Sequence, residues 1–234
     1  MSQDTNLLKH QFTLLCEGAA DQNFVKELLK KRSGLPEFNF LDPKEHYSAS
    51  KFGEMLNAVQ GDQKSFSRRL KGVLIIADSA SNPGQTVKNI REQVREAGNF
   101  PLHPSSSMAA PNVPAATTGM PPVHITLLPT ESTPGGLETL CVEVLLKKYP
   151  WAEACLKKYL TCDQINASNW PAEKLDKARY HCLVAAIHRD DPSKAVSSAF
   201  RQPKGTNAKP LIEVMDPIFD DIAKRIKDFC DALA

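Results

Sequence analysis

The fold is decided by the stretch Val73-Leu74-Ile75-Ile76-Ala77-Asp78, in which five apolar residues are followed by an acidic one. An apolar run without alternation predicts a strand that is buried on both faces, as in a parallel sheet. Asp78 closes this strand, and residues 79–84 form a loop. The spacing of the next apolar residues predicts a helix over residues 85–97.

The same alternation extends to both sides of this strand. Upstream, strands are expected at residues 12–16 and 38–41, with helices at 21–32 and 51–60. We expect Asp21 to be the N-cap of the first helix, because its side chain can accept from free backbone N–H groups. Downstream, residues 123–128 continue the sheet. Strands that alternate with helices indicate right-handed βαβ units and an α/β fold.

The second half of the chain is predicted to be helical. Its apolar spacing indicates four helices, near residues 137–145, 151–159, 175–187 and 217–229. We therefore expect an α/β core over residues 10–133 and a helical extension over residues 134–234 that packs on it. A Pro-rich excursion at 99–122 interrupts the core, and the longer stretch 97–130 has no charged residue. We interpret the excursion as a loop.

Composition excludes several classes of protein. The chain has 29 basic and 27 acidic residues and a net charge of +2, which argues against a basic nucleic-acid coat and an acidic disordered chain. There is no run of about 18 apolar residues and no signal-peptide pattern at the start, so we expect a cytoplasmic protein without membrane contact. The six Cys have no metal-ligand or disulfide spacing, and we interpret them as buried, reduced thiols.

Acidic residues recur where the predicted strands end. Glu17 ends the first strand and Asp78 the third, while Glu131 follows the fourth and Glu138 lies in the next helix. In an open parallel sheet, ligands bind beyond the carboxyl ends of the strands. Carboxylate oxygens at one sheet edge suit Mg²⁺, which can polarise a phosphodiester and activate water.

Two of these segments carry a family resemblance. The segment Leu14-Leu15-Cys16-Glu17-Gly18-Ala19-Ala20-Asp21 resembles the first motif of the TOPRIM fold, and Ile75-Ile76-Ala77-Asp78-Ser79-Ala80 is similar to its second motif. Segments 127–129, 134–138 and 175–178 resemble a branch of bacterial TOPRIM-related proteins, akin to the nuclease domain of overcoming-lysogenisation-defect proteins. The resemblance covers roughly residues 10 to 231, and the order of the motifs is more specific than any one of them.

The resemblance implies a Rossmann-like, TOPRIM-type parallel sheet flanked by helices, and a Mg²⁺ site that acts on nucleic-acid phosphodiesters. Carried over by position, Asp78 would be the main Mg²⁺ ligand. Glu17 would be the acid/base or first metal-facing carboxylate, and Asp21 completes that motif and joins the metal-facing set. The implied role is nuclease-like, in phage defence or DNA maintenance.

One departure from the family pattern leaves alternatives open. Ala80 stands where the family usually has a second Asp, so an anionic metal ligand is missing, for which Ser79, Ser81 or Glu131 are candidate substitutes. The second hypothesis is therefore a degenerate module that acts as a binding or assembly partner of another protein. A third is a different doubly wound fold that binds a nucleotide or small phosphate at the same edge. Oligomeric state stays open.

The same residues also have purely structural interpretations. Glu17 would then be a solvated turn residue and Asp21 only a helix cap. Glu131 and Glu138 would complement the dipole of the following helix. Gly135-Gly136 either presents backbone N–H groups to a phosphate or, as we favour, forms a tight turn.

Overall fold

The computed structural model describes most of the chain. The described residues are 9–41, 52–61, 70–98, 100–103, 120–163, 165, 167–188, 190–203, 205 and 208–234. Most of the Pro-rich excursion therefore lies outside them. Leu102, shortly after the excursion begins, pairs with Val123, just after it ends, in a single parallel bridge.

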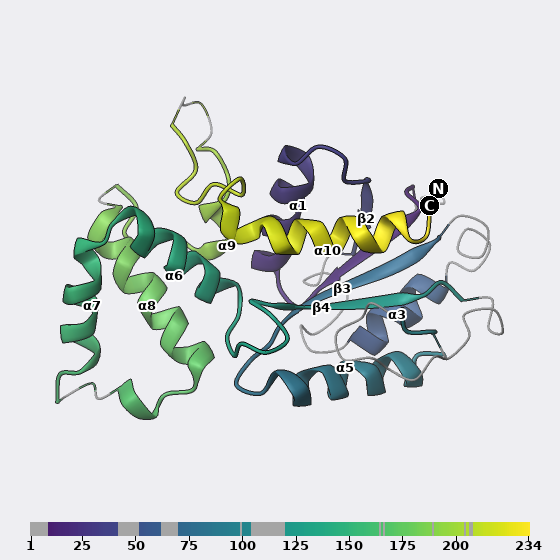
Figure 1. Ribbon diagram of the computed structural model, residues 1–234, viewed down its shortest axis with the longest axis horizontal. Helices are drawn as coiled ribbons and strands as arrows, with labels where there is room; N and C mark the ends of the chain where they lie inside the picture. Colours follow the sequence, from purple (N-terminus) through teal and green to yellow (C-terminus); the bar gives the residue numbers. More distant parts are fainter. Residues whose placement is uncertain are drawn as a thin grey trace, which may run out of the picture.

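A parallel sheet forms the centre of the molecule (Figure 1). In the described part of the chain it has four strands, β1 (Phe12–Cys16), β2 (Phe38–Phe40), β3 (Gly72–Asp78) and β4 (Val123–Leu128), in the order β2-β1-β3-β4. All three pairings are parallel. Every residue of β1 and β4 is buried, and so is all of β3 except Asp78. The α/β class and the doubly buried central strand are confirmed.

Helices cover both faces of this sheet, and the side chains of the strands alternate between them (Figure 1). Leu74 and Ile76 belong to the buried cluster that includes α1 (Ala19–Lys31) and α10 (Asp220–Asp231). The intervening residues of β3 belong to a second cluster, with α3 (Phe52–Gly61) and α5 (Pro83–Glu96). Burial on both faces explains why β3 has no polar alternation.

The chain leaves β1 and β3 toward opposite faces of the sheet. β1 leads into α1 on one face, whereas its neighbour β3 leads into α5 on the other. In open α/β sheets such a divergence is a topological switch point, and ligands bind in the crevice at the carboxyl ends of the two strands. Glu17 and Asp78 lie at those two ends.

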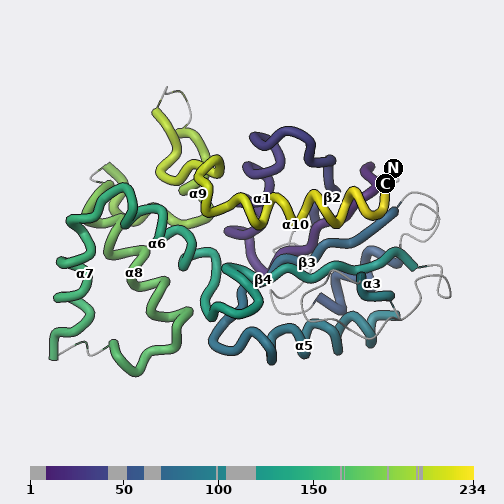
Figure 2. Tube along the Cα trace, in the orientation of Figure 1, coloured from purple at the N-terminus to yellow at the C-terminus, as the bar shows by residue number. Residues whose placement is uncertain are grey.

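The remaining helices follow β4 and lie beyond the carboxyl ends of the strands, as the trace in Figure 2 shows. They are α6 (Leu137–Lys148), α7 (Trp151–Leu160), α8 (Ala172–Ile187) and the short α9 (Val196–Ala199), with 3₁₀ turns at Ala167–Asn169 and Pro217–Phe219. Buried residues of α6 and α8 share one apolar cluster with β1. None of the described helices has the length and apolar character needed to span a bilayer.

Two local expectations need correction. Asp21 is not the N-cap of α1: Gly18 is, and the Oδ2 of Asp21 accepts a hydrogen bond from the N–H of Gly18 at 3.0 Å from within the first turn. The helix therefore begins two residues before the position predicted. Burial of the thiols holds for only half of them, since Cys155 is exposed and Cys162 and Cys182 are partly exposed.

Candidate functional site

Glu17 and Asp78 meet at the switch point between β1 and β3. The Oε2 of Glu17 accepts a hydrogen bond from the N–H of Asp78 at 3.2 Å. The side chain of Asp78 turns toward α6, where its Oδ1 accepts from the N–H of Leu137 at 3.0 Å. The two residues that were predicted from the strand ends are thus neighbours, and the first turn of α6 completes their surroundings.

The glycine pair before α6 lets the chain approach Asp78 closely. A Cβ atom on Gly136 would lie 2.5 Å from the Cγ of Asp78, so no larger residue fits there without displacing the carboxylate. Gly135 has φ +136°, a backbone conformation that favours glycine. The N–H of Gly136 donates to the Oγ1 of Thr139 at 3.0 Å. The pair forms the tight turn that we favoured, and its neighbouring N–H groups are used within the protein.

Asp21 and Glu138 extend the cluster. Asp21 is buried, and burial together with the charges of Glu17 and Glu138 raises its pKa to about 7. Burial also raises the pKa of Asp78 well above its ordinary value, and Asp21, Glu17 and Glu138 add to that rise. Four carboxylates therefore repel one another across one crevice. A bound cation would relieve this repulsion.

Two residues of α8 at this site were missed by the sequence analysis. Burial raises the pKa of Glu17, the backbone N–H of Asp78 lowers it, and the charges of Glu173 and Lys177 act in opposite directions. The Nζ of Lys177 donates to the Oε1 of Glu173 at 2.7 Å. A Glu and a Lys four residues apart are common on solvated helix faces, so their spacing gave no sign of this position.

Other predicted residues have partners elsewhere. Glu131 forms an ion pair with Arg225 of α10. The hydroxyl of Ser79 is buried and donates to the carbonyl oxygens of Thr133 and Gly135 at 2.6 and 3.2 Å, which ties the end of β3 to the loop after β4. Ser81 is exposed in the loop before α5.

Ala80 occupies an unusual backbone position. Its φ is +53°, in the left-handed region, and its N–H and carbonyl form two hydrogen bonds with Gly135, at 2.9 and 2.8 Å. The backbone of Ala80 is therefore fixed against the turn that precedes Leu137, the residue whose N–H donates to Asp78.

The donor chemistry fits Mg²⁺, although the ligands are not gathered. Among the described residues, no group of three or more His, Cys, Asp or Glu side chains is arranged to hold a metal ion. Mg²⁺, however, keeps several waters and commonly uses only one or two carboxylates. Glu17 and Asp78 each have one carboxylate oxygen in a hydrogen bond to a backbone N–H, which leaves the other available as a hard donor.

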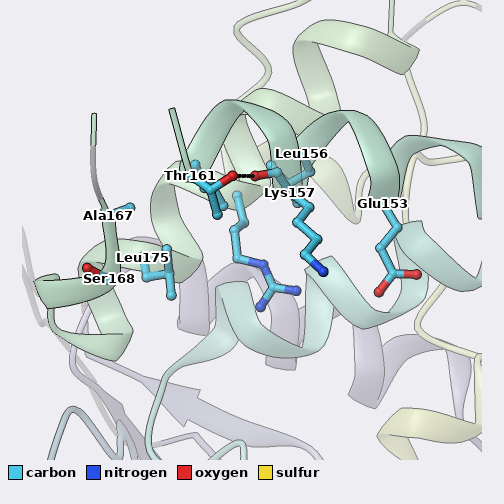
Figure 3. A pocket seen from close by; sticks show the side chains of 9 residues that line it. Glu153, Leu156, Lys157, Thr161, Ala167, Ser168 and Leu175 are labelled. Carbon is cyan, nitrogen blue, oxygen red and sulfur yellow. Dashed lines mark hydrogen bonds between the residues drawn. The ribbon is translucent and has the colours of Figure 1, made fainter. Parts of the chain in front are cut away.

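A separate cavity of about 380 Å³ lies between α7 and α8 (Figure 3). Its lining is mixed: Leu156 and Leu175 are among its apolar side chains, and Glu153, Lys157 and Arg179 are its charged members. None of the predicted site residues lines it. The cavity is therefore distinct from the carboxylate crevice.

The comparisons with known proteins give a family. Residues 11–220 match the model of a family described as "Protein of unknown function (DUF3226)". No curated protein and no solved structure matches the chain. The matched region includes β1, β3, α6 and α8, and so all the residues of the carboxylate crevice.

Proposed function

This chain belongs to the DUF3226 family, and we propose that it is a TOPRIM-like protein that binds Mg²⁺ at Glu17 and Asp78 and acts on nucleic-acid phosphodiesters. The observation that carries the proposal is the contact of Glu17 with the backbone of Asp78 at the switch point of a parallel sheet. Ligands bind at such points in open α/β sheets. The order of the two motifs that resemble the TOPRIM family supports the same assignment.

The surroundings of each residue decide the role that we propose for it. Asp78, oriented by the N–H of Leu137, would be the principal ligand, with Glu17 beside it. The metal would polarise the phosphodiester and lower the pKa of a bound water. Because burial raises the pKa of Glu17, this side chain is better suited than an ordinary carboxylate to accept a proton. Lys177 supplies a positive charge that acts on Glu17.

A degenerate module that binds another protein is the second candidate. Ala80 favours it, since the position of the missing Asp offers no carboxylate. The lack of three gathered donors among the described residues favours it too. Under this candidate, the carboxylate cluster would be a remnant, and the protein would bind metal weakly and cleave nothing.

Calorimetry with Mn²⁺ and Mg²⁺ tests the first proposal. The wild-type protein should bind, and Asp78→Asn, which preserves shape but removes the charge, should weaken binding by about 100-fold or more. Glu143→Gln, an exposed residue on α6, is the matched control and should bind normally. Absence of binding to the wild type would refute the metal site.

A nuclease assay separates the two candidates. Single- and double-stranded DNA and RNA are incubated with the wild-type protein and Mn²⁺. Cleavage that Asp78→Asn removes supports the first candidate. Metal binding without cleavage of any substrate, together with co-purification of a second protein, supports the degenerate module.

A further inference from the structure

Asp176 of α8 is a buried carboxylate that the proposed chemistry does not use. It is only 6% exposed. Its Oδ2 accepts a hydrogen bond from the hydroxyl of Thr139 on α6 at 2.6 Å, and its Oδ1 accepts from the Nη1 of Arg179 at 3.2 Å. Both carboxylate oxygens therefore have partners, one on a different helix and one on its own.

Thr139 connects this carboxylate to the start of α6. Its Oγ1 donates to Asp176 and accepts from the N–H of Gly136 at 3.0 Å. A hydroxyl has one hydrogen and two lone pairs, so these two bonds have opposite directions and fix its rotation. A Cβ atom on Gly135 would lie 2.1 Å from the Oγ1 of Thr139 and 3.4 Å from the Oδ2 of Asp176. The backbone of the turn at Gly135 is thus in close contact with the side chains of Thr139 and Asp176.

The next N–H along the chain, that of Leu137, donates to Asp78, the proposed metal ligand. Gly136 is bonded to Thr139, and the following N–H, of Leu137, donates to the Oδ1 of Asp78. The two N–H groups belong to successive rigid peptide planes that meet at Gly136, whose φ and ψ are −159° and −160°. Because Leu137 belongs to α6, the bond from Gly136 to Thr139 fixes the first plane relative to the helix and so restricts the direction of the N–H of Leu137. A continuous path of short contacts therefore runs from Asp176 through Thr139 to Asp78.

We propose that Asp176 and Thr139 are positioning residues that orient the first turn of α6 and, through it, the carboxylate of Asp78. The inference rests on the proposed role of Asp78 as a metal ligand. Groups that orient metal ligands from behind typically change metal affinity by about 10- to 100-fold when they are removed. The pair explains why a buried carboxylate on α8 faces the start of α6.

This role is separable from a general contribution to folding. α6 and α8 also pack through buried apolar side chains, including Leu140, Val144 and Leu183. These contacts keep the two helices together when the hydroxyl bond is absent. Thr139→Val, which has the same shape without the hydroxyl, should therefore fold.

The test compares Mn²⁺ affinity across matched variants of the full chain. Thr139→Val and Asp176→Asn should each weaken Mn²⁺ binding by about tenfold. Thr139→Ser retains the hydroxyl and should restore wild-type affinity. Thr161→Val is the control: it removes a similar hydroxyl bond, to the carbonyl of Lys157 on α7, away from the crevice (Figure 3). Wild-type affinity in a folded Thr139→Val protein would overturn the proposal, and so would equal losses in the Val and Ser variants.

Amide hydrogen exchange gives a readout that does not need the metal. In Thr139→Val, the N–H groups of Gly136 and Leu137 should both exchange faster than in the wild type, whereas in Thr139→Ser they should not. Unchanged exchange at Leu137 would refute the positioning role. If the wild type binds no Mn²⁺ but the exchange rates change as expected, the metal site fails and the positioning of Asp78 stands.

Discussion

Two acidic residues at the ends of neighbouring parallel strands of this sheet have opposite surroundings. Asp78, the last residue of β3, lies where Glu17, Asp21 and Glu138 are its charged neighbours. Glu131, shortly after β4, forms an ion pair with Arg225 of α10. The first carboxylate is surrounded by like charges, and the second is neutralised. Position at the carboxyl edge of the sheet therefore does not by itself decide the electrostatic surroundings of a carboxylate.

The difference follows from the path of the chain. After β1 and β3 the helices depart to opposite faces, so neither α1 nor α5 places a basic side chain against Asp78, and the start of α6 lies there instead. β4 is an edge strand of the described sheet, and α10 packs beside it. Glu131, which follows β4, is therefore within reach of Arg225 on α10.

The largest expected effect concerns Asp78, which has like charges as neighbours. Asp78→Asn should weaken Mn²⁺ binding by about 100-fold or more, because it removes the principal anionic donor. Glu131→Gln should leave Mn²⁺ affinity unchanged. Both affinities are measured by calorimetry at pH 8. Equal effects of the two substitutions would remove the distinction between the two positions.

Ala80→Asp should increase the affinity for Mn²⁺. Asp tolerates a positive φ better than most residues, so the backbone bonds with Gly135 can persist. The added carboxylate should tighten Mn²⁺ binding by about tenfold. Titration of Ala80→Asn, which is isosteric but uncharged, is the control. A folded Ala80→Asp protein with unchanged affinity would show that the position does not face the metal.

The pH dependence of stability tests the repulsion within the crevice. Burial and like charges raise the folded-state pKa values of Asp21, Asp78 and Glu17. Carboxylates with raised pKa values bind more protons in the folded state, so their contribution to stability is lost as the pH rises. For Asp21 this window extends from its ordinary range to about 7.

Without metal, the Tm should fall by a few degrees between pH 5 and pH 8, corresponding to about 1 kcal/mol. Mg²⁺ should restore part of this loss at pH 8 and little at pH 5, because ligands must be deprotonated to bind. Asp21→Asn should flatten the metal-free profile in thermal melts. A Tm that rises with pH in the wild type would contradict the account.

The smallest effect concerns the neutralised carboxylate. Glu131→Gln should lower the free energy of unfolding by about 1 kcal/mol, as for a partly exposed ion pair. Arg225 retains Asp221 as a partner at 2.6 Å, which limits the loss. Urea denaturation measures this loss in the free energy of unfolding, with Glu143→Gln as the control. A loss as large as several kcal/mol would mean that Glu131 does more than pair with α10.

Much of this arrangement is readable from sequence because it depends on local patterns. The uninterrupted apolar run of β3 predicts burial on both faces, and alternation of strands with helices predicts a parallel sheet. Together these place Glu17 and Asp78 at one edge. Their contact then follows from the adjacency of β1 and β3.

What sequence patterns did not predict are the partners that come from distant helices. Arg225 is 94 residues from Glu131, and Asp176 is 37 residues from Thr139. The apolar spacing of α8 indicates how it packs, and carries no information about which strand ends its charged residues face. The N-cap of α1 was misplaced because Asp21 bonds the backbone from the third helical position as readily as a cap would.

Paramagnetic broadening by Mn²⁺ tests the central claim most directly. In amide spectra of the wild-type protein, the signals of Gly18, Ser79 and Leu137 should broaden first as Mn²⁺ is added, and in Asp78→Asn they should persist. These residues adjoin Glu17 and Asp78 or donate to Asp78. Broadening that begins elsewhere, or that is the same in Asp78→Asn, would contradict a metal site at the carboxyl ends of β1 and β3.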